Sequence, residues 1–234
     1  MGVEQYLKKE LEDVVFINLK DQFFKGKENL EFLRGVPIPV SLSHISQDAK
    51  EGGDRNTISP AAAAEAMVYV IGADGNFPYL EQYLRFLDTS VKLPYLYILG
   101  MGISKAEEED YKKAAILFLA ADRFNRWKRK KGPVAPMRRD PRKPESPDAM
   151  YNYARACRDI FMESEVTAEK NAFREESVRV FETLREDFPD FDQSYFFLGY
   201  FYMNKKEYQK AKIAWDRFLE LTNDENMKED VESR

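Results

Sequence analysis

Residues 195–202 read Tyr-Phe-Phe-Leu-Gly-Tyr-Phe-Tyr, and residues 208–215 read Tyr-Gln-Lys-Ala-Lys-Ile-Ala-Trp. In both stretches, large apolar side chains recur every three or four residues, which is the spacing of one face of an α-helix. The polar residues between them, Asn204–Glu207, are typical of a turn. The small residues Gly199 and Ala211 would let two antiparallel helices cross closely there. The side chains expected to fill the seam around this crossing are Leu198, Tyr202 and Trp215.

The same pattern recurs upstream. Leu96-x-x-Leu99-Gly100-x-x-Ile103 opens a second helix pair, and Tyr111–Phe118 closes it. Ser177–Phe181 belongs to the second helix of a third pair, with Pro189 as a helix stop behind it. Its first helix fits best at Tyr153–Ile160, which leaves about eight extra residues before Ser177.

The repeat length is 34 residues, which separates Ser177 from Ala211 and also Leu80 from Ala114. Residues 77–87 therefore read as the second helix of a degenerate pair, with Ala61–Ile71 as its first helix. Fixed spacing of this kind is the signature of stacked repeat architectures.

These motifs resemble the tetratricopeptide repeat (TPR) family over residues 61–126 and 149–222. The resemblance implies an all-α fold of stacked antiparallel helix pairs, a TPR-like α-solenoid, here with an N-terminal helical extension. In this family the first helices line a concave face that binds a protein or peptide. Members that grip a terminal carboxylate place Lys and Asn on that face, whereas this chain has Tyr, Met and Phe. The side chains implied as partner-binding are Tyr97, Met101, Arg158, Phe196, Tyr200 and Met203.

The aromatic character of that face suggests that it is covered, because large apolar patches seldom stay bare. One alternative is that other parts of the same chain cover it. We expect the N-terminal segment to shield at least the first half of the array. The last pair, with Phe196, Tyr200 and Met203, is then the expected site for an external partner.

The N-terminal forty residues are read as a helix extending to about Phe24, although Asp13–Ile17 could instead form a short strand. A short helix at Asn29–Arg34 ends at Gly35, and Val36–Val40 must be extended because each proline constrains its predecessor. Ser59-Pro60 is a helix start. The expected organisation is an N-terminal region at 1–59, helix pairs at 60–127, a basic proline-rich linker at 128–147, helix pairs at 148–223, and a polar tail at 224–234.

A basic run lies at residues 123–143, with ten Lys and Arg and one acid, Asp140. The charge of this run is +9, and because the net charge of the chain is −5, the remaining residues together carry −14. Clustered cations attract polyanions, and an interleaved Trp could stack on a base. Nucleic-acid or polyanion binding is therefore the alternative function, against a solvated helix end. The residues that would serve it are Arg126, Trp127, Lys128, Arg129, Lys130, Lys131, Arg138 and Arg139.

The sequence contains few residues that could form a catalytic or metal-binding site. The single histidine, His44, and the single cysteine, Cys157, are far apart and suggest neither a metal site nor a disulfide. Cys157 reads as a buried thiol and His44 as a loop residue. We expect no catalytic residues, no cofactor and no metal. With no signal peptide and no long apolar run, we expect a cytoplasmic protein that does not insert into a membrane.

Overall fold

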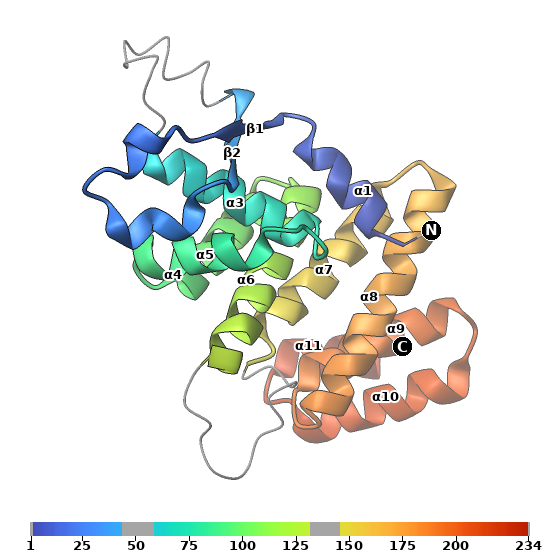
Figure 1. The fold of residues 1–234 in the computed structure, drawn as a ribbon. Coiled ribbons are helices and arrows are strands. Elements are labelled where there is room, and N and C mark those ends of the chain that lie inside the picture. Colours follow the sequence, from blue (N-terminus) through green and yellow to red (C-terminus); the bar gives the residue numbers. More distant parts are fainter. Residues whose placement is uncertain (1, 44–58, 132–145, 234) are drawn as a thin grey trace. The chain divides into compact units, whose positions relative to one another are not determined.

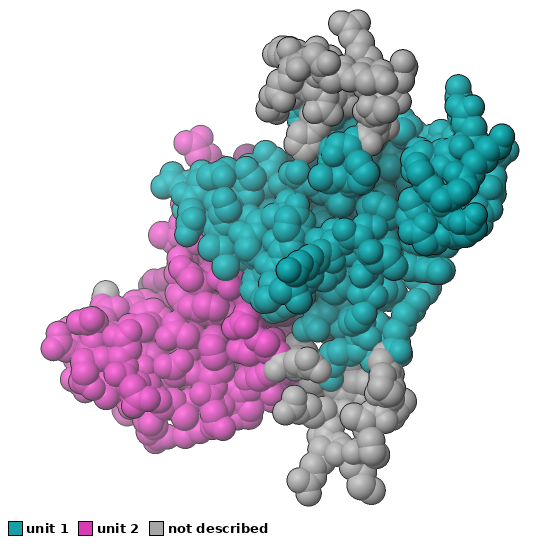
Figure 2. All heavy atoms as spheres, turned by 90° about the vertical axis from the view of Figure 1, so that its left-hand side faces the viewer, with its two compact units in different colours: residues 1–141 teal, residues 142–234 magenta. Residues whose placement is uncertain are grey.

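The computed structural model describes residues 2–43, 59–131 and 146–233 of the chain. The chain divides into two compact units, residues 1–141 and residues 142–234 (Figure 2). Apart from one two-stranded sheet, the described regular structure is helical (Figure 1). The fold class expected from the sequence is therefore confirmed as mostly helical, with a small sheet that the all-α expectation left out.

The N-terminal segment is shorter in helix than predicted, and the strand alternative is the correct one. The first helix ends at Lys8, and Val14–Asn18 forms a strand that pairs antiparallel with Pro37–Ser41. β-Branched residues favour this pairing, because Val15 faces Val40 and Ile17 faces Ile38. Gly35, with φ of +74°, ends the short helix as expected. The elements are α1 (Glu4–Lys8), η1 (Lys9–Leu11), β1 (Val14–Asn18), η2 (Asp21–Phe24), η3 (Glu28–Leu33) and β2 (Pro37–Ser41).

Four longer helices form the rest of unit 1. Strand β2 buries Ile38 and Val40 against α3, and the Tyr83 hydroxyl on α4 donates to the Pro37 carbonyl. The Ser59 hydroxyl caps α3 by accepting from the Ala61 amide at 3.2 Å. These helices are α3 (Pro60–Ala73), α4 (Leu80–Ser90), α5 (Pro94–Glu107) and α6 (Tyr111–Lys131).

The pairing of these helices departs from the predicted repeat. Helix α3 does contact α4, but it packs more extensively against α6. The reason is Gly72: a Cβ at this position would lie 1.9 Å from the Ile116 carbonyl oxygen, so the two backbones nearly touch. This crossing lies outside the 34-residue pattern. Unit 1 is therefore centred on α6, which contacts both α3 and α5.

The α5–α6 pair exists as predicted, but the register of its motif is wrong. Gly100 was expected at the crossing, yet no described atom lies within 4 Å of a Cβ built there. Gly102 makes the close approach instead, because its Cβ would lie 2.6 Å from the Phe118 ring. Ile98 and Gly102 form the buried side of α5. Leu96 and Ile103, predicted for the seam, are exposed.

Unit 2 consists of consecutive helix pairs in which neighbours from α7 to α10 contact one another (Figure 1). The Ser177 hydroxyl donates to the Ala154 carbonyl at 2.8 Å, and the two residues stand at similar distances from the turn, as antiparallel helices require. The residues predicted as an insertion before Ser177 lengthen its helix instead. The elements are α7 (Asp148–Glu163), α8 (Thr167–Asp187), α9 (Asp192–Asn204), α10 (Tyr208–Leu221) and α11 (Glu225–Glu232).

The α9–α10 crossing has the small residues expected, with a different neighbour over Gly199. A Cβ on Gly199 would lie 2.0 Å from Trp215 Nε1, so the indole, rather than Ala211, occupies the space above the glycine. Trp215 Nε1 also donates to the Phe196 carbonyl at 3.3 Å. Ala211 is fully buried and Ser177 occupies the corresponding place in α8.

Two predicted boundaries are wrong. Residues 128–131, expected to belong to the linker, are helical because α6 continues to Lys131, and residues 132–145 lie outside the described part of the chain. The polar tail contains α11, whose N-terminus is capped by Asp224 accepting from the Met227 amide at 3.2 Å.

Candidate partner-binding surfaces

The outward face of α5 carries a stripe of exposed apolar side chains. Leu93, Leu96, Tyr97 and Ile103 are 62%, 58%, 41% and 42% exposed, respectively. At 100° per residue, Leu96, Tyr97 and Ile103 fall on one side of α5, close to Gly100 and opposite the buried Ile98 and Gly102, and Leu93 directly precedes the helix. We call this set, with Gly100, the α5 stripe. Of the predicted partner-binding residues, Tyr97 lies in the stripe and Met101 is partly buried beside it.

Leu93 holds an unusual backbone conformation at the start of the stripe. It precedes α5 with φ of 50° and ψ of 60°, in the left-handed region. A branched apolar residue in this region costs about 1–2 kcal/mol. Strain of this kind is concentrated at functional sites. Here it places a mostly exposed leucine at the end of an apolar helix face.

The expected N-terminal shield covers a different surface. β2 packs on α3, η3 packs on α4, and α1 packs on α3 and α6. Phe16 of β1 stacks on Phe77 with ring centroids 5.5 Å apart. The N-terminal segment thus covers parts of α3, α4 and α6, while Tyr97 of the expected concave face and the rest of the α5 stripe remain exposed.

The last helix pair was expected to be the open site, and the structure covers it. Phe196, Tyr200 and Met203 pack against a buried cluster of Trp215, Phe218 and Val231. Val231 belongs to α11, and the Tyr200 hydroxyl donates to the Asp230 carboxylate of the same helix. The exposed aromatic face predicted here is therefore internal to unit 2. We call the surface of α9 and α10 that α11 covers the aromatic groove; it comprises Phe196, Tyr200, Met203, Trp215 and Leu219.

Arg158 does not join the other predicted partner-binding residues at an open face. Its guanidinium lies 5.0 Å from the Phe197 ring centroid and pairs with Asp159 at 2.5 Å. Both interactions occur within unit 2 and leave the side chain partly buried. Arg158 therefore connects α7 to α9, and we assign it a packing contribution in this structure.

The basic end of α6 is largely engaged with acids of the same unit. Lys128 pairs with Asp88 at 2.6 Å and Lys131 pairs with Glu81 at 2.8 Å, both on α4. The Lys131 ammonium also lies 4.7 Å from the Trp127 ring centroid, so the ring already has a cationic partner. Such pairing reduces the positive field that a polyanion would meet.

Further members of the basic run are also used internally. Arg126 donates to Asp122 at 2.7 Å, one helical turn away, and Arg123 donates to the carbonyls of Ile71 and Gly72 at the end of α3. Arg129 and Lys130 continue the helix. The predicted residues Arg138 and Arg139 lie outside the described residues.

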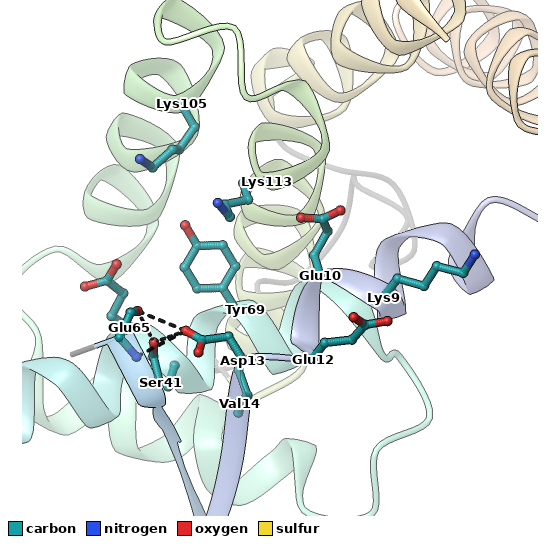
Figure 3. A pocket seen from close by; sticks show the side chains of 12 residues that line it. Lys9, Glu10, Glu12, Asp13, Val14, Ser41, Glu65, Tyr69, Lys105 and Lys113 are labelled. Atoms are coloured by element: carbon teal, nitrogen blue, oxygen red, sulfur yellow. Dashed lines mark hydrogen bonds between the residues drawn. The ribbon is translucent and has the colours of Figure 1, made fainter. Parts of the chain in front are cut away.

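Unit 1 contains a charged pocket that the sequence did not predict (Figure 3). Its volume is about 410 Å³, and its lining comes from segments far apart in the sequence, including Asp13, Ser41, Glu65, Tyr69, Lys105 and Lys113. The Asp13 carboxylate is fixed by the hydroxyls of Ser41, at 2.5 Å, and Ser43, at 2.9 Å. Because its residues come together only in the fold, no local motif could have indicated this pocket.

Two titratable groups in the pocket, Lys113 and Tyr69, have raised pKa values. Lys113 bonds Asp110 at 2.8 Å, and this bond raises the pKa of its ammonium. Burial, together with the negative charge of Glu65, raises the pKa of the Tyr69 phenol. The Tyr69 hydroxyl points towards Lys105 and Lys113 (Figure 3). A protonated lysine and a protonated tyrosine can donate hydrogen bonds, but neither is activated as a base or nucleophile at neutral pH.

Cys157 is fully buried on α7, and burial raises the pKa of its thiol well above the ordinary value. This agrees with the interpretation of a buried thiol. His44 lies outside the described residues. Within residues 2–43, 59–131 and 146–233, no three His, Cys, Asp or Glu side chains gather as metal ligands would. No helix in those ranges has the length and apolar character needed to cross a bilayer.

Comparison with other proteins adds no assignment. Against known protein families, characterised proteins and solved structures, no match reaches significance.

Proposed function

We propose that this chain is a protein-interaction module built of TPR-like helix pairs, and that a protein partner docks on the α5 stripe. The observation that supports this proposal is the exposure of Leu96, Tyr97 and Ile103 along one face of α5, with the exposed Leu93 directly before the helix. Contiguous apolar patches of a few hundred Å² on a soluble protein commonly mark interaction sites. The TPR resemblance led to the same class of function, with a different set of contact residues.

The shape of the stripe favours a helical or extended protein segment. Gly100 lies at its centre without a side chain, and no described atom lies within 4 Å of a Cβ built there. A partner backbone can therefore approach closely between Leu96 and Ile103. Burying a patch of about 300 Å² contributes on the order of 7 kcal/mol before the cost of association is subtracted. Since a micromolar Kd requires a net of about 8 kcal/mol, we expect the stripe alone to support a weak, reversible complex with a Kd of about millimolar magnitude or above.

The test places a photo-crosslinking phenylalanine analogue at position 97 of the full chain in its native host. The matched control carries the same analogue at position 213, because Ile213 on α10 is 68% exposed and lies outside the stripe. We expect a discrete crosslinked protein from position 97 and none from position 213. Equal crosslinking from both positions, or none from position 97, would refute the proposal.

A pair of charge substitutions provides an independent measurement. Leu96→Glu with Ile103→Glu should abolish the crosslink from position 97, because two apolar contacts worth about 1.5–3 kcal/mol each are removed. Ile213→Glu should leave the crosslink unchanged. Both variants should retain the far-UV circular dichroism of the parent, since the substituted side chains are already exposed.

A further inference from the structure

A second surface of unit 2 is occupied by the chain's own helix. Helix α11 lies against the aromatic groove through Met227 and Val231, which are spaced by four residues and therefore point to the same side. Asp230 on that side accepts a hydrogen bond from the Tyr200 hydroxyl. Gln193 on α9 contacts the Met227 sulfur at 3.5 Å. The groove thus accepts a helix that presents two apolar side chains and a carboxylate on one side.

Helix α11 is short and buries one side chain. The helix has eight residues, and of these Val231 is the one that is buried. Side chains attach it to α9 and α10: Met227 and Val231 pack with Trp215 and Phe218, and the Asp230 carboxylate accepts from the Tyr200 hydroxyl. A helix this short is marginal in isolation and depends on its packing. The close approach of Trp215 to Gly199 is made within the α9–α10 pair and includes no atom of α11.

We infer that the aromatic groove is a receptor for an acidic amphipathic helix of a partner protein, and that α11 is its displaceable internal occupant. The partner helix presents two apolar side chains four residues apart, in the places of Met227 and Val231. A carboxylate between them takes the place of Asp230 and accepts from the Tyr200 hydroxyl. An amphipathic helix laid into an apolar groove is an established mode of peptide recognition.

Three observations favour a partner helix as the second occupant. The groove is lined by aromatic side chains and Met203, a lining that adapts to different apolar ligands. Its hydrogen-bond donor, Tyr200, selects a carboxylate at a defined place. The weak attachment of α11 leaves an incoming helix of higher affinity able to replace it, since displacement depends on the difference between the two affinities.

The probe is a fluorescently labelled synthetic peptide of residues 222–234, titrated by anisotropy against the full chain. Val231→Asp releases the internal helix, because a carboxylate cannot occupy the buried place of Val231. A tethered helix competes at an effective concentration of about millimolar, so the released variant should bind the peptide at least about tenfold more tightly than the parent chain. Glu229→Ala, an exposed substitution on the same helix, should bind like the parent.

A locked form closes the same groove. Gln193→Cys with Met227→Cys, joined by a short bifunctional thiol reagent, holds α11 in place where these side chains meet. The native Cys157 is fully buried and will not compete for the reagent. The locked chain should bind no peptide. In the Val231→Asp background, Tyr200→Phe should weaken peptide binding several-fold, because the hydroxyl–carboxylate bond is lost.

The outcomes separate the inference from its competitors. A peptide that binds no variant, or that binds the locked chain as tightly as the released one, would overturn it. A concentration-dependent dimer of the parent chain that Val231→Asp abolishes in light scattering would assign the groove to α11 of a second copy, and would also overturn it. The far-UV circular dichroism of Val231→Asp should show that the other helices are retained, and this spectrum is the control for folding. None of these results depends on the α5 stripe, because it lies in the other unit.

Discussion

Two glycines that occupy the same place in the repeat motif should respond in opposite directions to alanine. Gly199 and Gly100 each follow a leucine at the expected helix crossing. A Cβ on Gly199 would lie 2.0 Å, 2.3 Å and 2.5 Å from three atoms of the Trp215 indole. At Gly100 no described atom lies within 4 Å of the added carbon. The structure therefore predicts a penalty at one position and a gain at the other.

The size of the difference follows from three contributions. Overpacking in Gly199→Ala costs about 1–3 kcal/mol, and displacing the indole from the Phe196 carbonyl costs about 1 kcal/mol more. The gain in helix propensity, about 0.5–1 kcal/mol, offsets part of this. Gly199→Ala should thus destabilise the protein by about 1–3 kcal/mol. Gly100→Ala receives the propensity gain alone and should stabilise it by about 0.5–1 kcal/mol.

The assay is urea unfolding, followed by tryptophan fluorescence and far-UV circular dichroism. The chain has two tryptophans, so the measurements are made with Trp127→Phe, which leaves Trp215 as the reporter. The emission of Trp215 should also change in Gly199→Ala, because the indole must move. Changes in the free energy of unfolding that are equal for the two substitutions would refute the close approach at Gly199.

Two further predictions concern buried titratable groups. Burial and the 2.7 Å bond to Glu182 raise the pKa of Tyr202 to about 12, above the unfolded value of about 10. The contribution of Tyr202 to stability is therefore complete below about pH 10 and is lost as the pH rises towards 12. Urea titrations across this window should show a shallower decline in the free energy of unfolding for Tyr202→Phe than for the parent, and identical declines would contradict the assignment. Cys157, buried with a raised thiol pKa, should react with an aromatic disulfide reagent at neutral pH only after urea is added, and rapid reaction of the native protein would show that α7 does not bury it.

Local sequence patterns were sufficient for the helices from α3 to α10 and for several of their ends, but they missed α11. Ser59-Pro60 begins α3, and Pro189 follows α8 two residues after its last residue. These signals work because caps and prolines act on the backbone within a few residues. The N-terminal strand was harder, since Leu7, Leu11 and Val14 fit a helix while Val14–Ile17 also fit a strand. Pairing with residues more than twenty positions away decided between them.

The sequence could not predict which faces of the helices are exposed. Helix α5 has two apolar faces, one with Ile98 and Gly102 and one with Leu96 and Ile103, and the repeat motif lies on the second, which is exposed. Periodicity gives the angular separation of the faces but does not say which of them meets another helix. The ring of Phe118 made that choice, because it needs the space over Gly102.

The sequence by itself determined that this is a helical protein with paired helices and a small residue at the last crossing, because propensity, capping and 3.6-residue periodicity act locally. Only the tertiary structure decided which faces are covered. It placed α11 over the aromatic residues Phe196 and Tyr200, left the α5 stripe open, and neutralised Lys128 and Lys131 with acids of α4. Each of these outcomes depends on which distant segment reaches a given surface, and that competition for burial is settled by the whole chain rather than by the residues that line the surface.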